Sequence, residues 1–146
     1  MAKKIAAKGE PGKLQVKDFV ITDEFATVGE EMSVRDAARA LLDMKRGVVL
    51  VKGKDQKVMG VVTERKILKG IMDLKEDPMS EGIEKIMDTH ILYVKHDDLL
   101  EDALTEIKKN RPAAVIVNDK EGGFMGYFSP IDYIEAENKL KAIKKQ

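Results

Sequence analysis

The sequence contains no cysteine and carries no net charge at neutral pH. The absence of cysteine excludes a disulfide framework, a thiolate nucleophile and a cysteine-based zinc site. The 26 basic and 26 acidic residues balance, so there is no general electrostatic reason to expect nucleic acid or an anionic membrane as the main partner. No apolar stretch approaches the roughly 20 residues that a membrane span needs, and no apolar signal core follows the first residues. We therefore expect a cytoplasmic protein.

Apolar residues are present in the amount that a folded core requires. Of the 146 residues, 43% are hydrophobic and 36% are charged. The apolar share is too high for a disordered chain, and the charged share exceeds the usual quarter. A single core at this length buries roughly 68–70% of the surface of the unfolded chain. We expect a globular protein with a highly charged surface, built as one ordinary domain or two very small ones.

The main organising feature is an internal repeat with an offset of 66 residues, which aligns Val20 with Ile86 and continues without a gap to Leu68 and Ile134. Chance rarely produces such a match over this length, and a repeat of this kind determines the architecture. The matched pairs are Val28 with Val94, Asp36-Ala37 with Asp102-Ala103, Val49 with Val115, Val51 with Val117, Met59-Gly60 with Met125-Gly126, and Thr63 with Ser129.

Both copies have the same hydrophobic periodicity. A short apolar strand leads to a helix with one apolar face, followed by a β-branched strand, a turn, a returning antiparallel strand and a second helix. Ser33 with Asp36, and Asp98 with Glu101, are predicted to cap the first helix of each copy. The fold class expected is therefore α/β (α+β) with two β-α-β-β-α units. Because a three-stranded sheet with two helices leaves one sheet face bare, we expect the copies to pack sheet to sheet.

The boundaries expected from this repeat divide the chain into five parts. Asp77-Pro78 ends the helix that precedes it and keeps the connection between the copies short. The expected parts are a flexible basic tail (1–15), the first repeat (16–76), a linker (77–81), the second repeat (82–136) and a C-terminal helical extension (137–146).

The duplicated pattern resembles a tandem CBS-domain pair, also called a Bateman module. The resemblance covers residues 16 to 136, and it lies in the order, spacing and duplication of several short motifs. It implies two repeats about a pseudo-two-fold axis with two clefts that bind adenosine-type ligands, and further pairing into a homodimer. The motifs are Met32-Ser33-Val34-Arg35-Asp36-Ala37-Ala38, Val58-Met59-Gly60-Val61-Val62-Thr63-Glu64-Arg65, the linker ending in Asp77-Pro78 with Ile83-Glu84-Lys85-Ile86-Met87, and Met125-Gly126-Tyr127-Phe128-Ser129-Pro130-Ile131-Asp132.

The second copy carries the complete cleft motif of this family, from Gly126 to Asp132. A helix N-terminus offers free N–H groups to a phosphate, a carboxylate in the first turn can accept hydrogen bonds from a ribose diol, and a serine hydroxyl can reach either group. Ser129 and Asp132 are therefore the candidate ligand residues. The resemblance places the base against two segments, Thr89, His90 and Ile91 before the first strand of this copy, and Ala114, Val115 and Ile116 in the next strand. Ser129 and Asp132 are equally typical of a helix cap, and the two interpretations are compatible.

The first copy departs from the motif. Thr63 is present, but Lys66 stands where the second copy has Asp132. Lysine cannot accept a hydrogen bond from ribose, although it can attract a phosphate. Thr63 and Lys66 therefore mark a weaker second cleft, and a solvated helical lysine is the alternative interpretation.

We expect a regulatory module that binds AMP, ADP, ATP or an S-adenosylmethionine-like ligand and signals to a separate effector protein. The alternative is a non-catalytic dimerisation or interaction module with vestigial clefts, whose contacts would be with protein or nucleic acid. No required cofactor, metal site or enzyme activity is expected. No carboxylate cluster at ligand spacing joins His90 and His96, and no nucleophile set or phosphate-binding loop is present.

Overall fold

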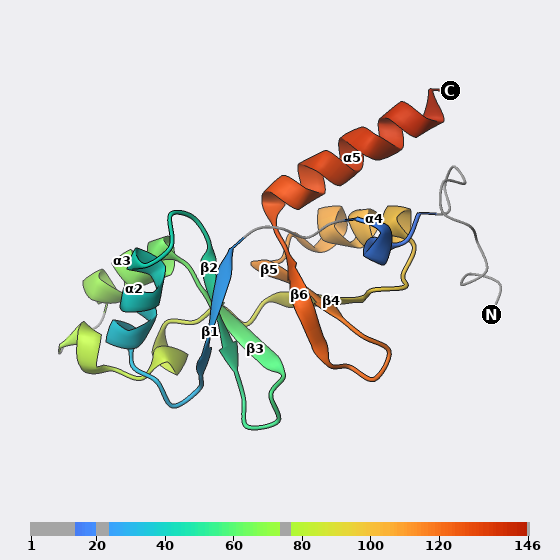
Figure 1. Cartoon of the computed structure of the whole chain (residues 1–146). Helices are drawn as coiled ribbons and strands as arrows, with labels where there is room; N and C mark the ends of the chain where they lie inside the picture. The colour runs from blue at the N-terminus through green and yellow to red at the C-terminus, as the bar shows by residue number, and fades with distance from the viewer. Residues whose placement is uncertain (1–13, 20–23, 74–76, 146) are drawn as a thin grey trace. The chain divides into compact units, whose positions relative to one another are not determined.

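The computed structural model describes residues 14–19, 24–73 and 77–145, and its helices and strands repeat the same order twice (Figure 1). The fold is mixed α/β with two three-stranded sheets, ordered β1-β2-β3 and β4-β5-β6. The predicted fold class is confirmed at this level. The strands are β1 (Phe25–Gly29), β2 (Val48–Lys52), β3 (Val58–Val62), β4 (Ile91–Lys95), β5 (Ala114–Asn118) and β6 (Phe124–Phe128). The helices are α2 (Val34–Leu42), α3 (Glu64–Asp73), α4 (Leu100–Asn110) and α5 (Pro130–Lys144), with short 3-10 turns η1 (Val16–Asp18), η2 (Pro78–Ser80) and η3 (Ile83–Lys85).

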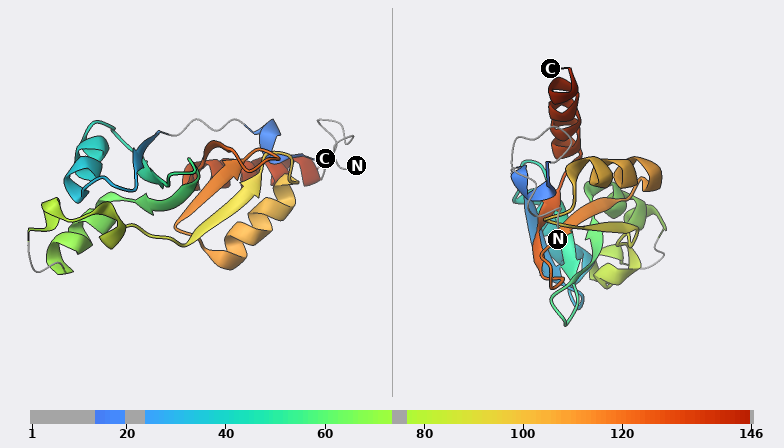
Figure 2. Two further views of the ribbon diagram at one scale, coloured as in Figure 1. Left: turned by 90° about the horizontal axis from the view of Figure 1, so that it is seen from below. Right: turned by 90° about the vertical axis from the view of Figure 1, so that its right-hand side faces the viewer.

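The described residues form two packing units. The first unit contains residues 24–73 and 77–91, and the second contains 14–19 and 92–145. In each unit the two helices pack on one face of the sheet, where they share an apolar core with it (Figure 2). In the first sheet β1 runs parallel to β2, and β3 returns antiparallel to β2. The second hairpin, β5 with β6, has the same register with the same shift before its last pair, as a faithful duplication requires.

The segment from Leu14 to Phe19 packs in the second unit, although the repeat in the sequence assigns most of it to the first copy. The amide of Leu100 donates to the carbonyl of Leu14 at 2.6 Å, and the amide of Val16 donates to the carbonyl of Asp98 at 2.9 Å. Leu14 and Val16 are buried in the core of this unit. This segment therefore supplies backbone partners at the beginning of α4.

The first unit contains the matching arrangement at the beginning of α2. The amide of Val34 donates to the carbonyl of Glu81 at 2.8 Å, and the amide of Ile83 donates to the carbonyl of Met32 at 2.9 Å. Each of these helices thus begins against the segment that precedes the other repeat in the sequence. We call residues 14–19 and 81–87 the leader segments.

One predicted cap is confirmed and one is wrong. Ser33 and Asp36 exchange side-chain hydrogen bonds with each other's backbone amides, at 3.2 and 3.0 Å. Asp98 does not cap α4, because its carboxylate accepts the amide of Lys95 at 2.9 Å and closes the preceding turn. In place of a side-chain cap, the amide of Leu100 at the beginning of α4 donates to the backbone carbonyl of Leu14 in the leader segment.

Candidate functional site

A hollow of about 250 Å³ opens in the second unit where β5 begins and β6 ends, beside the end of α4 and the beginning of α5. The predicted residues Ala114, Val115 and Ser129 all belong to its wall. Every side chain in this wall is uncharged. The complete wall is Ile107, Pro112, Ala113, Ala114, Val115, Tyr127, Phe128, Ser129, Pro130, Tyr133 and Ile134.

Ser129 and Asp132 form a buried capping box at the beginning of α5. The Ser129 Oγ accepts the amide of Asp132 at 3.0 Å, and the amide of Ser129 donates to Oδ2 of Asp132 at 3.0 Å. Pro130 occupies the first helical position, where the missing N–H has no intrahelical partner to lose. The two side chains are only 4% and 1% exposed. The capping interpretation is confirmed, and Ser129 itself belongs to the wall of the hollow.

The other predicted residues of the second copy occupy different positions. Ile116 points to the face of β5 opposite to Val115 and Val117, which lie in the helix-covered core. Asp132 lies outside the wall as described, held in the cap behind Ser129. Thr89, His90 and Ile91 belong to the first unit.

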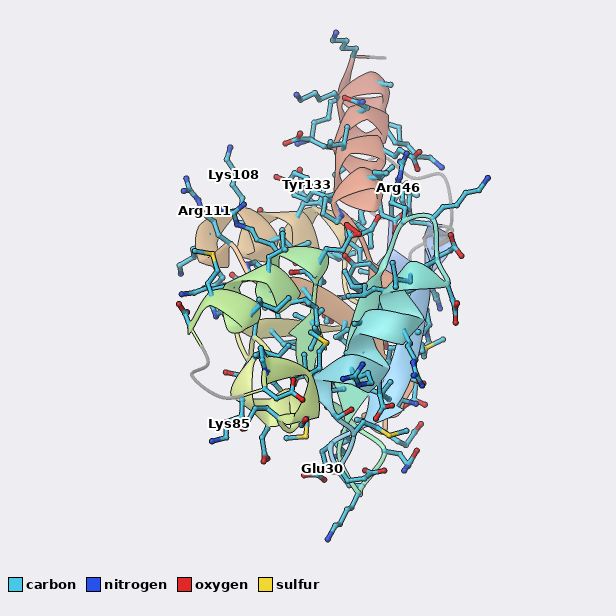
Figure 3. The ribbon with its side chains drawn as sticks, turned by 90° about the vertical axis from the view of Figure 1, so that its left-hand side faces the viewer. Glu30, Arg46, Lys85, Lys108, Arg111 and Tyr133 are labelled. Atoms are coloured by element: carbon cyan, nitrogen blue, oxygen red, sulfur yellow. The ribbon has the colours of Figure 1, made fainter. Side chains whose placement is uncertain are left out.

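Sequence reasoning missed Tyr133, which lies in the first turns of α5 and lines the hollow (Figure 3). Burial is the main reason that its pKa is raised, with a further contribution from the carboxylate of Glu137. The Tyr133 hydroxyl donates to Oε2 of Glu137 over a long 3.4 Å. Tyr133 follows Ser129 by four positions, so the helical period that predicts α5 already places the two residues on one helix face.

The first unit is organised differently around Lys66. The Oγ1 of Thr63 accepts the amide of Lys66 at 3.2 Å, so Thr63 caps the beginning of α3. The Lys66 ammonium pairs with Oδ2 of Asp88 at 3.7 Å, and both side chains are about one-third exposed, at 34% and 30%. Asp88 also accepts the amide of His90 through Oδ1 at 2.9 Å and exchanges two backbone hydrogen bonds with Val61. Lys66 therefore contacts the segment that leads to Thr89 and His90.

The hollow beside α3 is smaller and charged. It measures about 120 Å³, and its wall includes Lys66, Lys69, Lys85 and Asp73. Each lysine has a carboxylate partner: Lys66 pairs with Asp88, Lys69 with Asp73 at 2.9 Å, and Lys85 with Glu81 at 4.0 Å. The two hollows lie at different positions of the repeat, since no residue of one wall is the repeat equivalent of a residue of the other.

Within the three described ranges, no group of three or more His, Asp or Glu side chains could hold a metal ion. A search of the same residues finds no helix long and apolar enough to cross a membrane.

Comparison with known families matches the CBS domain twice, over residues 16–73 and 83–139. The chain belongs to the CBS-domain family. An uncharacterized protein of Methanocaldococcus jannaschii is 31% identical over 148 residues, which cover 94% of this chain and 32% of that protein. A homoserine O-acetyltransferase of Methanohalobium evestigatum is 29% identical over 117 residues, covering 80% of this chain and 23% of the enzyme. The CBS pair thus spans a third or less of these relatives.

Solved structures show the same CBS-pair fold over most of their own length. A CBS-domain containing protein of Agrobacterium tumefaciens has a TM-score of 0.71 at 24% identity, covering 90% of this chain and 97% of that one. CBSX2 in complex with AMP has a TM-score of 0.67 at 22% identity, with 88% and 98% covered. A CBS domain pair in complex with 5′-methylthioadenosine and S-adenosyl-L-methionine has a TM-score of 0.68 at 20% identity, with 86% and 96% covered.

Proposed function

We propose that this CBS pair is a regulatory module that binds an adenosine-type ligand at the hollow of the second unit. The observation that carries the proposal is the convergence of Ala114, Val115 and Ser129 on one hollow at the beginning of α5. The bound AMP, 5′-methylthioadenosine and S-adenosylmethionine in CBS structures of the same fold support this class of ligand. The module acts in the cytoplasm by signalling to a separate effector protein, without catalysis of its own.

Each residue has a role that its chemistry permits. We propose that Ser129 contacts the ligand from the wall, and that the Asp132 carboxylate, which is 1% exposed behind Ser129, becomes accessible to the ribose diol when the ligand binds. Ala114 leaves room for the base, because its side chain is small. Thr89, His90, Ile91 and Ile116 remain proposed base contacts from the family resemblance.

The proposal assigns one ligand to each chain. Lys66 occupies the position of Asp132 and is paired with Asp88, so α3 presents no carboxylate to a ribose at this position. Thr63 and Lys66 define at most a weaker phosphate-attracting site.

A melting screen with adenosine, AMP, ATP and S-adenosylmethionine tests the proposal. A ligand at about 100 times its dissociation constant stabilises the folded chain by roughly 2.7 kcal/mol, which is easily measured as a rise in Tm. The proposal predicts such a rise for at least one compound, with a calorimetric stoichiometry of one per chain. If no compound raises Tm at millimolar concentration, the clefts are vestigial.

The second candidate function is an interaction module, and a specific surface favours it. Four large apolar side chains on α2 and α3 are exposed, and Leu42 and Met72 are each 84% exposed. Apolar side chains gathered on adjoining helices are typical of a protein interface. A second copy of this chain is the occupant that we propose, which makes a homodimer. The four residues are Leu42, Leu68, Ile71 and Met72. Sedimentation distinguishes the cases, since a 16.3 kDa species at micromolar concentration contradicts the dimer.

A further inference from the structure

We infer that the first unit binds a small zwitterion, the chemistry of a free α-amino acid, at the edge of its sheet. A third hollow, of about 480 Å³, lies where the edge strand β1 ends, beside the turn between β2 and β3. Its volume is within the roughly 300–1,000 Å³ typical of small-molecule pockets. We call it the edge hollow, and its wall includes Gly29, Glu31, Met32, Lys52, Lys54 and Gln56. The inference does not depend on adenosine binding in the second unit.

The wall of the edge hollow carries both signs of charge. Glu31 supplies a carboxylate, and Lys52 and Lys54 supply ammonium groups. In the part of the chain that the structure describes, Glu31 and Lys54 form no ion pair and no side-chain hydrogen bond, so both charges are available to a ligand. An amino acid carries an ammonium and a carboxylate on one carbon, and each can meet an opposite charge here. A ligand with a single charge would meet its own sign as well.

Gly29 allows the carboxylate of Glu31 to lie directly over the strand. A Cβ at position 29 would be 2.7 Å from Oε2 of Glu31 and closer still to Oε1, which is nearer than Cβ atoms approach in folded proteins. Gly29 is the register partner of Lys52, and adjacent strands lie about 5 Å apart, so the carboxylate and the base of the lysine side chain are neighbours. The glycine therefore brings the two signs of charge together at one end of the sheet.

The second repeat does not carry this combination of residues. At the offset of 66, Lys95 stands in the position of Gly29, and the uncharged Asn118 stands in the position of Lys52. The glycine that admits the carboxylate and the lysine beside it are therefore both particular to the first unit. Met32, which is 38% exposed, adds a flexible apolar side chain to the wall and suits an amino acid with an apolar side chain.

NMR titration of the full chain at about pH 6 tests the inference, because α-amino groups are protonated and carboxylates ionised there. The probes are L-leucine, N-acetyl-L-leucine, which lacks the ammonium, and L-leucinamide, which lacks the carboxylate. We expect L-leucine to shift the amide resonances of Gly29 and Gly53, and to bind at least about threefold more tightly than either derivative. Equal binding of a derivative overturns recognition of the zwitterion. No shift at the solubility limit of L-leucine overturns the site and leaves the adenosine proposal intact.

Matched glycine variants separate the placement of the carboxylate from folding. The backbone at Gly29 lies outside the left-handed region, so alanine is accommodated once the flexible Glu31 side chain turns away. Gly29→Ala and Glu31→Gln should each weaken L-leucine binding at least about threefold. Gly82→Ala is the control, because Glu84 also follows two residues later but its Oε1 would lie at an ordinary 3.5 Å from the new Cβ. Normal binding in Gly29→Ala or Glu31→Gln, or an equal loss in Gly82→Ala, contradicts the inference.

A pair of lysine variants tests the other charge. Lys54 belongs to the wall, whereas Lys57, in the same turn, does not. Lys54→Gln should weaken L-leucine binding at least about threefold, and Lys57→Gln should bind as wild type does. Equal affinities of these two variants for L-leucine would overturn recognition of the ligand carboxylate by Lys54.

Discussion

Substitution of Asp132 separates the two roles of this side chain, because capping affects stability and ribose recognition affects affinity. In the folded chain its carboxylate accepts the amide of Ser129, and both residues are buried. Asp132→Ala leaves that buried N–H without its partner, which costs about 1–3 kcal/mol. Asp132→Asn retains a carbonyl oxygen as acceptor and should lose less stability. Ser129→Ala removes the other half of the box and should cost about 0.5–2 kcal/mol.

The effect on ligand binding should differ in pattern from the effect on stability. Two charge-assisted hydrogen bonds to the ribose diol contribute about 1.5–3 kcal/mol each, so Asp132→Ala should weaken binding at least about tenfold. Asp132→Asn loses the charge and should also bind weakly, although it folds nearly as well as wild type. 2′-Deoxyadenosine compounds, which lack one ribose hydroxyl, should bind the wild type more weakly than the matching adenosine compounds do. The Asp132 variants should show little difference in affinity between the two kinds of compound.

The first unit provides a control with the same geometry. Ser33 and Asp36 form the same capping box on α2, where they are only partly buried. Asp36→Asn should change stability slightly and ligand affinity not at all. Urea unfolding and calorimetric titration of both asparagine variants give the comparison. Ligand affinity unchanged in Asp132→Asn would refute ribose recognition by Asp132 and leave it as a cap alone.

Three further predictions concern the scaffold. Gly60→Ala should lower Tm, because a Cβ at Gly60 would lie 2.6 Å from Sδ of Met87; the double variant with Met87→Ala should recover part of the loss. Leu14→Ala should destabilise by about 2–5 kcal/mol, and amide exchange should report the loss in the second unit rather than the first. Hydrogen bonds from Ser33 lower the pKa of Asp36, so its contribution to stability is present above the ordinary aspartate pKa and disappears as the pH falls through the lowered value. Urea unfolding from pH 2 to 6 should show a shallower acid dependence in Asp36→Asn, and an identical slope would contradict this.

The duplicated elements could be predicted from the sequence because their information is local. The match of Val49 with Val115 and the placement of Ser33 before an apolar helix depend on periodicity and capping within a few residues. Ser129, Ala114 and Val115 come together for the same reason, since both strands of the hairpin and the helix after it are contiguous in the sequence.

The features that sequence reasoning missed depend on distant contacts. Asp98 has the right chemistry for a cap, but a segment 84 residues earlier, at Leu14, bonds to the beginning of α4 instead. The ion pair between Lys66 and Asp88 joins α3 to a segment beyond η3, and no pattern in either segment predicts it. Tyr133 was overlooked because the family motif ends one residue before it.

The reciprocal use of the leader segments has a consequence for how such a chain can arise. The leader segment before each repeat packs against the first helix of the other repeat. The backbone hydrogen bonds are those from Leu100 to Leu14 and from Val34 to Glu81. Two separate copies of a one-repeat chain could form the same reciprocal contacts with each other. A homodimer of such chains would therefore already contain these contacts before the two genes were fused. Fusion changes the covalent path and leaves the backbone hydrogen bonds where they were.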